Sequence, residues 1–233
     1  MGSKALVLLS GGLDSTTCLA LAVNSLGADN VITLSLLYGQ KHQCEVKAAQ
    51  NISAYFGCKH ILLEFPNIFT GYGSTLIDPE RQHPEISYQE ISNSFEVSPT
   101  YVPFRNGNLL SAATALALGE KADCIYYGAH AEDSQGFAYP DCTPEFNGAM
   151  ANAIYIGTYH KVRLLTPLQW LSKKEVVELA QKMNSPIHMT YSCYTGREQH
   201  CGKCPTCISR IAAFKKAGFK DPVEYELAIN WEE

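Results

Sequence analysis

Short apolar runs alternate with segments of helical periodicity between residues 4 and 166. The apolar runs cover residues 4–10, 31–38, 60–65, 124–128 and 162–166, and the helical segments cover 14–24, 45–56, 108–121 and 145–156. This alternation is typical of parallel strands joined by crossover helices. We therefore expect an α/β fold with a five-stranded parallel doubly wound sheet, in which ligands bind beyond the carboxyl ends of the strands.

Two segments depart from this alternation. Residues 66–103 are rich in Pro, Ser, Asn, Gly and Tyr and have little periodicity, so we expect a loop or lid that packs on another part of the chain. From about residue 186 onward, cysteines crowd together before a helical pattern over residues 208–217. We therefore divide the chain into an α/β domain, residues 1–185, and a small helical metal-binding segment, residues 186–233, which we name the cysteine segment.

The charge and apolar composition exclude several classes of partner. The 233 residues carry a formal net charge of −5, whereas proteins that bind nucleic acid or anionic membranes usually have a basic excess. No run approaches the roughly 18 uncharged apolar residues of a membrane span, and the N-terminus lacks a secretory signal pattern. We expect a cytoplasmic protein that binds neither nucleic acid nor a membrane.

The turn after the first apolar run reads Ser10-Gly11-Gly12-Leu13-Asp14-Ser15. Backbone N–H groups at a helix N-terminus attract an anion, and paired glycines let a ligand come close to the backbone. The turn has neither the lysine of a Walker A loop nor the spacing of a dinucleotide fold. The alternative is an ordinary strand-to-helix turn in which Asp14 or Ser15 caps the helix.

Four of the nine cysteines lie within fifteen residues of one another, at positions 193, 201, 204 and 207. Four thiolates at this spacing predict a tetrahedral structural zinc site formed by Cys193, Cys201, Cys204 and Cys207. An iron–sulfur cluster is one alternative, and a redox pair formed by Cys204 and Cys207 is another. The other five cysteines follow no spacing rule and are expected to be reduced thiols.

The turn at residues 10–15 resembles the pyrophosphate loop, S-G-G-x-D-S, of the ATP pyrophosphatase superfamily. The resemblance implies an adenine nucleotide alpha hydrolase-like fold that binds ATP and generally cleaves it to AMP and pyrophosphate while adenylating a second substrate. It implies that Asp14 helps to hold Mg²⁺, which prefers oxygen ligands. Residues 166–176 resemble a later segment of the superfamily, where Lys173 would reach the phosphates. Ser172 and Glu175 could equally form a capping box that begins a helix.

Motifs in the middle and toward the end of the chain make the resemblance more specific, to one family within the superfamily. The order of four motifs resembles that in the 7-cyano-7-deazaguanine synthases. These motifs are residues 102–106 (V-P-F-R-N), the acidic pair at 132–133, residues 139–142 (Y-P-D-C) and the cysteine segment. The resemblance runs from about residue 4 to about residue 215. It implies an ATP-dependent ligase that converts 7-carboxy-7-deazaguanine and ammonia to 7-cyano-7-deazaguanine, a queuosine precursor, and it implies a homodimer.

The resemblance also implies roles for individual residues. The residues expected to be catalytic are Asp14, Lys173 and Arg105. The residues expected to contact the nucleotide are Leu9, Ser10, Gly11, Gly12, Leu13, Asp14, Ser15, Thr16, Tyr38, Gln40 and Gly128. The residues expected to contact the deazaguanine are Arg105, Asn106, Asp133, Tyr139 and Asp141. Structural alternatives stay open for several of these residues: Arg105 as an ion-pair residue, Asn106 or Asp133 as a helix cap, and Asp141 as a turn former.

Three functions remain open at this point. The first is the nitrile-forming ligase. The second is a related pyrophosphate-loop enzyme, such as one that couples the activated deazaguanine to a different amine, including a protein amine. The third is a zinc-knuckle binding module without catalysis, against which the complete ATP loop and the acidic loop argue.

Overall fold

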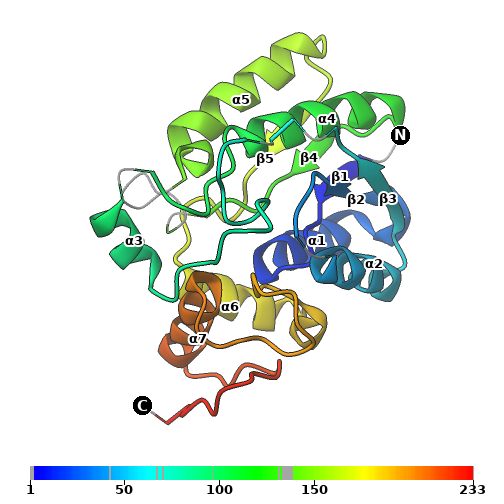
Figure 1. The fold of residues 1–233 in the computed structure, drawn as a ribbon. Coiled ribbons are helices and arrows are strands. Elements are labelled where there is room, and N and C mark those ends of the chain that lie inside the picture. The colour runs from blue at the N-terminus through cyan, green and yellow to red at the C-terminus, as the bar shows by residue number, and fades with distance from the viewer. Residues whose placement is uncertain are drawn as a thin grey trace.

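Five parallel strands form one sheet in the order β3-β2-β1-β4-β5 (Figure 1). The computed structural model describes residues 3–41, 43–66, 68–69, 71–95, 97–130, 132 and 139–232. The strands are β1 (Ala5–Leu8), β2 (Val31–Leu37), β3 (Lys59–Glu64), β4 (Cys124–Tyr126) and β5 (Arg163–Leu165). The predicted doubly wound sheet is confirmed. The strand order reverses between β1 and β4, so the ligand site of such a sheet is expected beyond the carboxyl end of β1.

The six longer helices in the described part of the chain are α1 (Leu13–Leu26), α2 (Cys44–Phe56), α4 (Arg105–Gly119), α5 (Pro144–Gly157), α6 (Lys173–Lys182) and α7 (Pro205–Ala217). Five of them begin and end close to the predicted ranges, and α6 begins at the predicted capping box. Helices α4 and α5 lie on one face of the sheet, whereas α1, α2 and α6 lie on the other, with α7 packed outside α6 (Figure 1). Short 3₁₀ helices at η1 (Ala28–Asn30), η3 (Pro140–Cys142) and η4 (Ile187–Met189) complete the connections.

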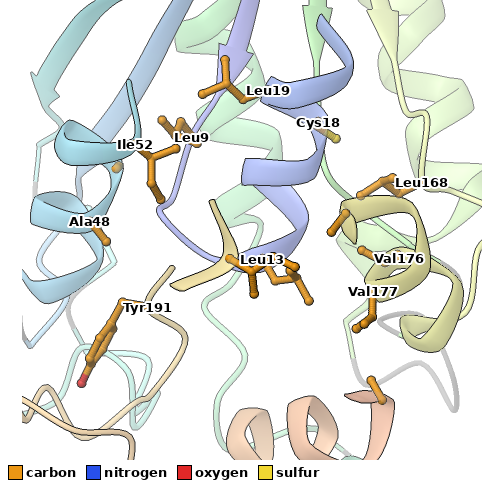
Figure 2. Close-up of a cluster of buried hydrophobic side chains, with 14 of the residues drawn as sticks. Leu9, Leu13, Cys18, Leu19, Ala48, Ile52, Leu168, Val176, Val177 and Tyr191 are labelled. Carbon is orange, nitrogen blue, oxygen red and sulfur yellow. The ribbon is translucent and has the colours of Figure 1, made fainter. Parts of the chain in front are cut away.

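The central strand β1 is buried on both of its faces, as its continuous apolar sequence predicts. Leu6 and Leu8 point into a core shared with α4 and α5. Val7 points the other way, into a core formed by α1, α2, α6 and the cysteine segment. Figure 2 shows this second core, in which Leu13 of α1 lies among side chains from several elements. The cysteine segment is therefore part of the main core.

The segment from residue 66 to residue 103 contains a helix that the sequence analysis missed, α3 (Tyr88–Ser94). A capping box begins this helix: the Ser87 hydroxyl accepts the N–H of Glu90, and the Glu90 carboxylate accepts the N–H of Ser87. The described part of the segment packs on the rest of the chain, as expected of a lid. Tyr88 donates or accepts a 2.6 Å hydrogen bond with the hydroxyl of Tyr194 in the cysteine segment.

The chain after α7 folds back onto the preceding segment through a buried ion pair. Arg210 is 1% exposed and Asp221 is 2% exposed, and the Nε of Arg210 lies 2.6 Å from a carboxylate oxygen of Asp221. The same guanidinium donates to the hydroxyls of Thr190 and Ser192. None of the helices in the described residues combines the length and the apolar character needed to cross a membrane.

Candidate active site

A cavity of about 300 Å³ lies beyond the carboxyl ends of β1, β2 and β4, at the position expected from the strand order. Its lining residues come from the loop at residues 9–15, the ends of β2 and β4, α2, α4, α6 and the cysteine segment. Of the eleven residues assigned to the nucleotide, nine line the cavity: Leu9, Ser10, Gly12, Leu13, Asp14, Ser15, Tyr38, Gln40 and Gly128. Gly11 and Thr16 lie behind it.

The loop at residues 9–15 is held in shape by its own hydroxyls. The N–H of Ser10 donates to the Ser15 hydroxyl at 3.1 Å, and the two serine hydroxyls lie 3.0 Å apart. Gly12 is the N-cap residue of α1, and no side chain caps this helix. The alternative that Asp14 or Ser15 caps the helix is therefore wrong. The amides of the first turn remain available to a ligand in the cavity.

The two glycines of the loop have different surroundings. Gly11 has a φ of +91°, and a Cβ there would collide with the Glu45 carbonyl oxygen and lie 2.8 Å from the amide nitrogen of Ala49. Gly11 is thus required for close packing against α2. A Cβ on Gly12 would meet no atom closer than the Ser10 hydroxyl at 3.4 Å, and Gly12 lines the cavity. Only Gly12 fits the expectation that glycine gives a ligand access.

Asp14 and Lys173 form an ion pair at the edge of the cavity. The ammonium of Lys173 lies 2.7 and 2.6 Å from the two carboxylate oxygens of Asp14. Nε2 of the buried His130 lies 3.3 Å from the same ammonium and 3.7 Å from the carboxylate. Burial alone would raise the pKa of Asp14, but the charges of Lys173 and His130 hold it below its usual value of 3.8. The sequence analysis missed His130, because a lone histidine after a strand carries no spacing signal.

Lys173 is the first residue of α6, and the capping box predicted for this helix is confirmed. The Ser172 hydroxyl accepts the N–H of Glu175, and the Glu175 carboxylate accepts the N–H of Ser172. The N–H of Lys173 donates to Glu132 at 3.1 Å. These contacts fix the start of α6, so they place the Lys173 side chain toward Asp14.

Arg105 and Asn106, at the start of α4, line another part of the cavity. The Arg105 guanidinium donates to the Tyr38 hydroxyl at 3.2 Å and to the Asn106 side-chain oxygen at 3.3 Å. Asn106 does not cap α4, because the N-cap residue is Phe104, with a left-handed φ of 52°. The Asn106 amide instead donates to the carbonyl oxygen of Asp141 at 3.3 Å.

Two residues assigned to the deazaguanine, Asp141 and Tyr139, lie differently from what their roles imply. Asp141 is 4% exposed in the η3 turn, and its carboxylate accepts the N–H of Asn106 at 3.0 Å, outside the cavity lining. The Tyr139 hydroxyl shares a hydrogen bond with Thr100, and its ring packs edge-on against Tyr88. Asp133 lies outside the described residues.

Tyr38 and Gln40, which follow β2, line the cavity, and their polar groups form hydrogen bonds within the protein. The N–H of Tyr38 donates to Gln40 at 2.8 Å, and the Gln40 amide donates to the Leu36 carbonyl at 3.2 Å. Gln40 thus bridges the backbone of its own turn. The Tyr38 ring lies under the Arg105 guanidinium, 5.5 Å from its carbon.

The four clustered cysteines come together as predicted. Their sulfur atoms all lie within 4.8 Å of one another, all four residues are buried, and the sulfurs of Cys201 and Cys207 are 4.0 Å apart. A tetrahedral zinc ion with bonds of about 2.3 Å places its sulfurs about 3.8 Å apart. Backbone N–H groups of Cys201 and Cys204 donate to sulfur, which stabilises thiolates. The cluster could therefore hold one metal ion, and its geometry fits zinc.

The cysteine segment also forms one wall of the cavity. The N–H of Tyr191 donates to the carbonyl of Gly11 at 2.9 Å, which joins this segment to the loop after β1. The lining residues from this segment, which includes α7, are Tyr191, Ser192, Tyr194, Thr206 and Ser209. The cysteine segment thus contributes directly to the cavity.

The sequence analysis missed one acidic residue of the cavity, Glu45. It is the second residue of α2, is partly buried and lines the cavity. Burial raises its pKa to about 7, an effect opposed by Arg105 and reinforced by Cys193. Sequence periodicity placed Glu45 only as a first-turn residue of a helix, because the approach of α2 to the loop at residues 9–15 is a tertiary contact.

The sequence also matches known proteins over nearly its whole length. Residues 4–218 match the model of the family described as queuosine biosynthesis protein QueC. A 7-cyano-7-deazaguanine synthase from Thermoplasma volcanium is 41% identical, over 97% of this chain and 92% of its own length. The synthase from Caldicellulosiruptor saccharolyticus is 39% identical over 99% of both chains. The synthase from Oceanobacillus iheyensis is 40% identical over 96% of this chain and 99% of its own length.

Proposed function

The chain belongs to the QueC family of queuosine biosynthesis proteins, and on this premise we propose that it is the ATP-dependent ligase that converts 7-carboxy-7-deazaguanine and ammonia to 7-cyano-7-deazaguanine. The observation that carries the proposal is the Asp14–Lys173 pair beside the loop at residues 10–15, at the edge of a cavity that also contains Arg105. This arrangement combines a phosphate site, a cation-binding carboxylate and a guanidinium that suits a carboxylate substrate.

ATP would bind with its phosphates on the first turn of α1. The loop offers backbone amides and the hydroxyls of Ser10 and Ser15, and the helix dipole favours the negative charge there. Lys173 would pair with a phosphate oxygen, which releases the Asp14 carboxylate to coordinate Mg²⁺. Tyr38, Gln40 and Gly128 would contact the remainder of the nucleotide.

The carboxylate of the deazaguanine would pair with Arg105, whose guanidinium can bind two carboxylate oxygens at once. Asn106 is held by two contacts with Asp141, so Asp141 would act on the substrate through Asn106. Tyr139, which packs against Tyr88, would shape the binding pocket at the lid. Asp133 would accept the N–H groups of the base edge.

Two rounds of activation account for the overall reaction. A carboxylate oxygen leaves only after transfer to a nucleotide phosphate, so the first round makes an activated acid that ammonia converts to the amide. The amide oxygen is activated in the second round, and its loss with two protons from nitrogen gives the nitrile. Positioned amides, Lys173 and Mg²⁺ would stabilise the charge that develops on the phosphates in both rounds.

Zinc, the dimer and the cytoplasmic location belong to the same proposal. The distances between the four sulfurs support zinc as the bound ion. The homodimer is what family resemblance implies. The acidic net charge and the small size of the proposed substrates support the proposal that the protein does not bind nucleic acid.

The test is to incubate the purified protein with ATP, Mg²⁺, ammonium and 7-carboxy-7-deazaguanine and to follow the product by mass spectrometry. We expect the nitrile, with the amide as an intermediate. A parallel reaction without ammonium but with a lysine-containing peptide tests the alternative amine. A product that forms only with the peptide would replace the ligase proposal with that alternative, and no product in either reaction would overturn both.

A further inference from the structure

Glu45 lies beside the loop at residues 9–15, the proposed phosphate-binding loop, at the end of the cavity where activation would take place. The main chain of Glu45 packs so closely on Gly11 that a Cβ on this glycine would collide with the Glu45 carbonyl oxygen. The Glu45 side chain lines the same cavity as Asp14 and Arg105. On the proposed function, a carboxylate in this place would face the reacting group of the substrate.

Glu45 differs from the other charged residues of the cavity in its contacts. Asp14 and Lys173 pair with each other, and Arg105 donates to Tyr38 and Asn106. Within the described part of the chain, no hydrogen bond or ion pair engages the Glu45 carboxylate. Its electrostatic neighbours are the Arg105 guanidinium, the Cys193 sulfur and the Tyr194 hydroxyl. A carboxylate that is partly buried without a partner is poised to bind a cation or a proton.

We propose that the Glu45 carboxylate binds the ammonium ion and takes a proton from it, so that ammonia attacks the activated carboxyl group of the substrate. The inference rests on the proposed function and assigns a catalytic residue to its second substrate. Tyr191 and Tyr194, which line the same cavity, would supply aromatic rings that favour a small cation.

The proposed step balances in atoms and charge. NH₄⁺ transfers one proton to the Glu45 carboxylate and becomes NH₃. The nitrogen lone pair forms a bond with the carbonyl carbon, the bond from that carbon to the nucleotide oxygen breaks, and the nucleotide leaves with the electron pair. The nitrogen then loses a second proton to water, which leaves the neutral amide. A carboxylate with a pKa of about 7 is a stronger base than an ordinary glutamate and is still ionised in part at neutral pH.

The place of Glu45 favours this role over recognition of the base edge. In 7-carboxy-7-deazaguanine the carboxyl group is on the five-membered ring, and the N–H groups of the base edge are on the far side of the six-membered ring. Arg105, an electrostatic neighbour of Glu45, and the loop at residues 9–15 would together hold the carboxyl group at this end of the cavity, so the base edge would point away from Glu45. A role for Glu45 as a second Mg²⁺ ligand is an outcome that the experiment distinguishes.

The experiment compares two nucleophiles in the Glu45→Gln variant. Hydroxylamine is largely uncharged at neutral pH and attacks activated carboxyl groups without prior loss of a proton, whereas ammonium must lose one. The rates of hydroxamate and amide formation are measured with saturating ATP, Mg²⁺ and 7-carboxy-7-deazaguanine. We expect the ratio of the hydroxylamine rate to the ammonium rate to rise by about tenfold or more in Glu45→Gln. Glu178→Gln, which removes an exposed carboxylate from α6, is the matched control and should keep the wild-type ratio.

The ratio separates the possible outcomes. Equal losses with both nucleophiles would overturn the proposal, because they would place Glu45 in Mg²⁺ binding or substrate activation. A wild-type protein that forms neither product would instead refute the proposed function. Glu45→Asp keeps the charge but withdraws it by one methylene, and its ratio should rise less than that of Glu45→Gln. If Glu45→Gln does not fold, an unchanged ratio in Glu45→Asp overturns the proposal.

Discussion

The Lys173 ammonium contacts both carboxylate oxygens of Asp14, at 2.7 and 2.6 Å, although the two residues are 159 positions apart. The pair joins the first turn of α1 to the first turn of α6, across the carboxyl edge of the sheet. Each charge therefore satisfies the other. Binding of MgATP would exchange these partners, with the phosphate on Lys173 and the metal ion on Asp14.

This exchange predicts the effect of Asp14→Asn. The variant keeps the size of the side chain but loses the charge that binds Mg²⁺, so we expect turnover to fall by about 100-fold or more. Its zinc content should match that of the wild type, because the four cysteines lie elsewhere. Nitrile formation and bound metal are measured on the same preparation. A variant that retains turnover would contradict the role assigned to the pair.

Gly11→Ala and Gly12→Ala should separate stability from nucleotide binding. Gly11→Ala places a Cβ against the backbone of α2 at a φ of +91°, and we expect a loss of about 3 kcal/mol or more in the free energy of unfolding. Gly12 has a φ of −80°, and a Cβ added there would have no atom closer than 3.4 Å. Gly12→Ala should therefore change the free energy of unfolding by less than about 1 kcal/mol. Calorimetric titration should show weaker ATP binding in Gly12→Ala. Equal destabilisation of the two variants would count against the distinction.

Removal of the metal should weaken ATP binding as well as stability. The cysteine segment donates the Tyr191 N–H to Gly11 and contributes a wall of the cavity. We expect one zinc ion per chain by elemental analysis, and a large loss of ATP affinity after treatment with a chelator. Addition of zinc should restore the affinity. Unchanged ATP binding in the metal-free protein would show that this wall forms without the ion.

The buried pair of Arg210 and Asp221 should be far more important for stability than an exposed pair. Arg210→Met leaves the Asp221 carboxylate buried without its partner, so we expect a loss of about 3–5 kcal/mol in the free energy of unfolding. Arg197→Met is the control, since Arg197 is 62% exposed in its pair with Glu226 and should cost less than about 1 kcal/mol. Denaturant titration measures both. Similar losses would refute the importance of burial.

The raised pKa of Glu45 predicts how stability depends on pH. The folded protein keeps the Glu45 proton up to about pH 7, whereas the unfolded chain loses it near pH 4.5, so the folded state binds more protons between these values. Wild-type stability should therefore fall relative to Glu45→Gln as the pH rises from 4.5 to 7. The full shift corresponds to about 3 kcal/mol, and access of water to the cavity reduces this. A constant difference between the two proteins across this range would contradict the shift.

Sequence patterns predicted the sheet because buried parallel strands are continuous apolar runs, as in β1 and β2. They also predicted the capping box at Ser172, which depends only on residues close in sequence. Helix α3 was missed although it has the same local signal at Ser87 and Glu90, because seven residues are too few to show helical periodicity.

The parts of the candidate site that could not be predicted depend on contacts between distant residues. Asp14 was expected only as a Mg²⁺ ligand and Lys173 only as a phosphate ligand, and neither residue indicates the other in the sequence. Asn106 looked like a helix cap, but the left-handed Phe104 begins the helix and leaves Asn106 to bind Asp141. Glu45 enters the cavity only because Gly11 lets α2 approach the loop.

The wall that Tyr191, Ser192 and Thr206 contribute to the cavity has a consequence for synthesis of the protein. The loop at residues 9–15 leaves the ribosome almost two hundred residues before this wall. A chain in the course of translation would therefore have an incomplete cavity. If the cavity binds ATP as proposed, coupling between ATP and the substrate would begin only when the cysteine segment has emerged and folded, so unfinished chains would not consume ATP.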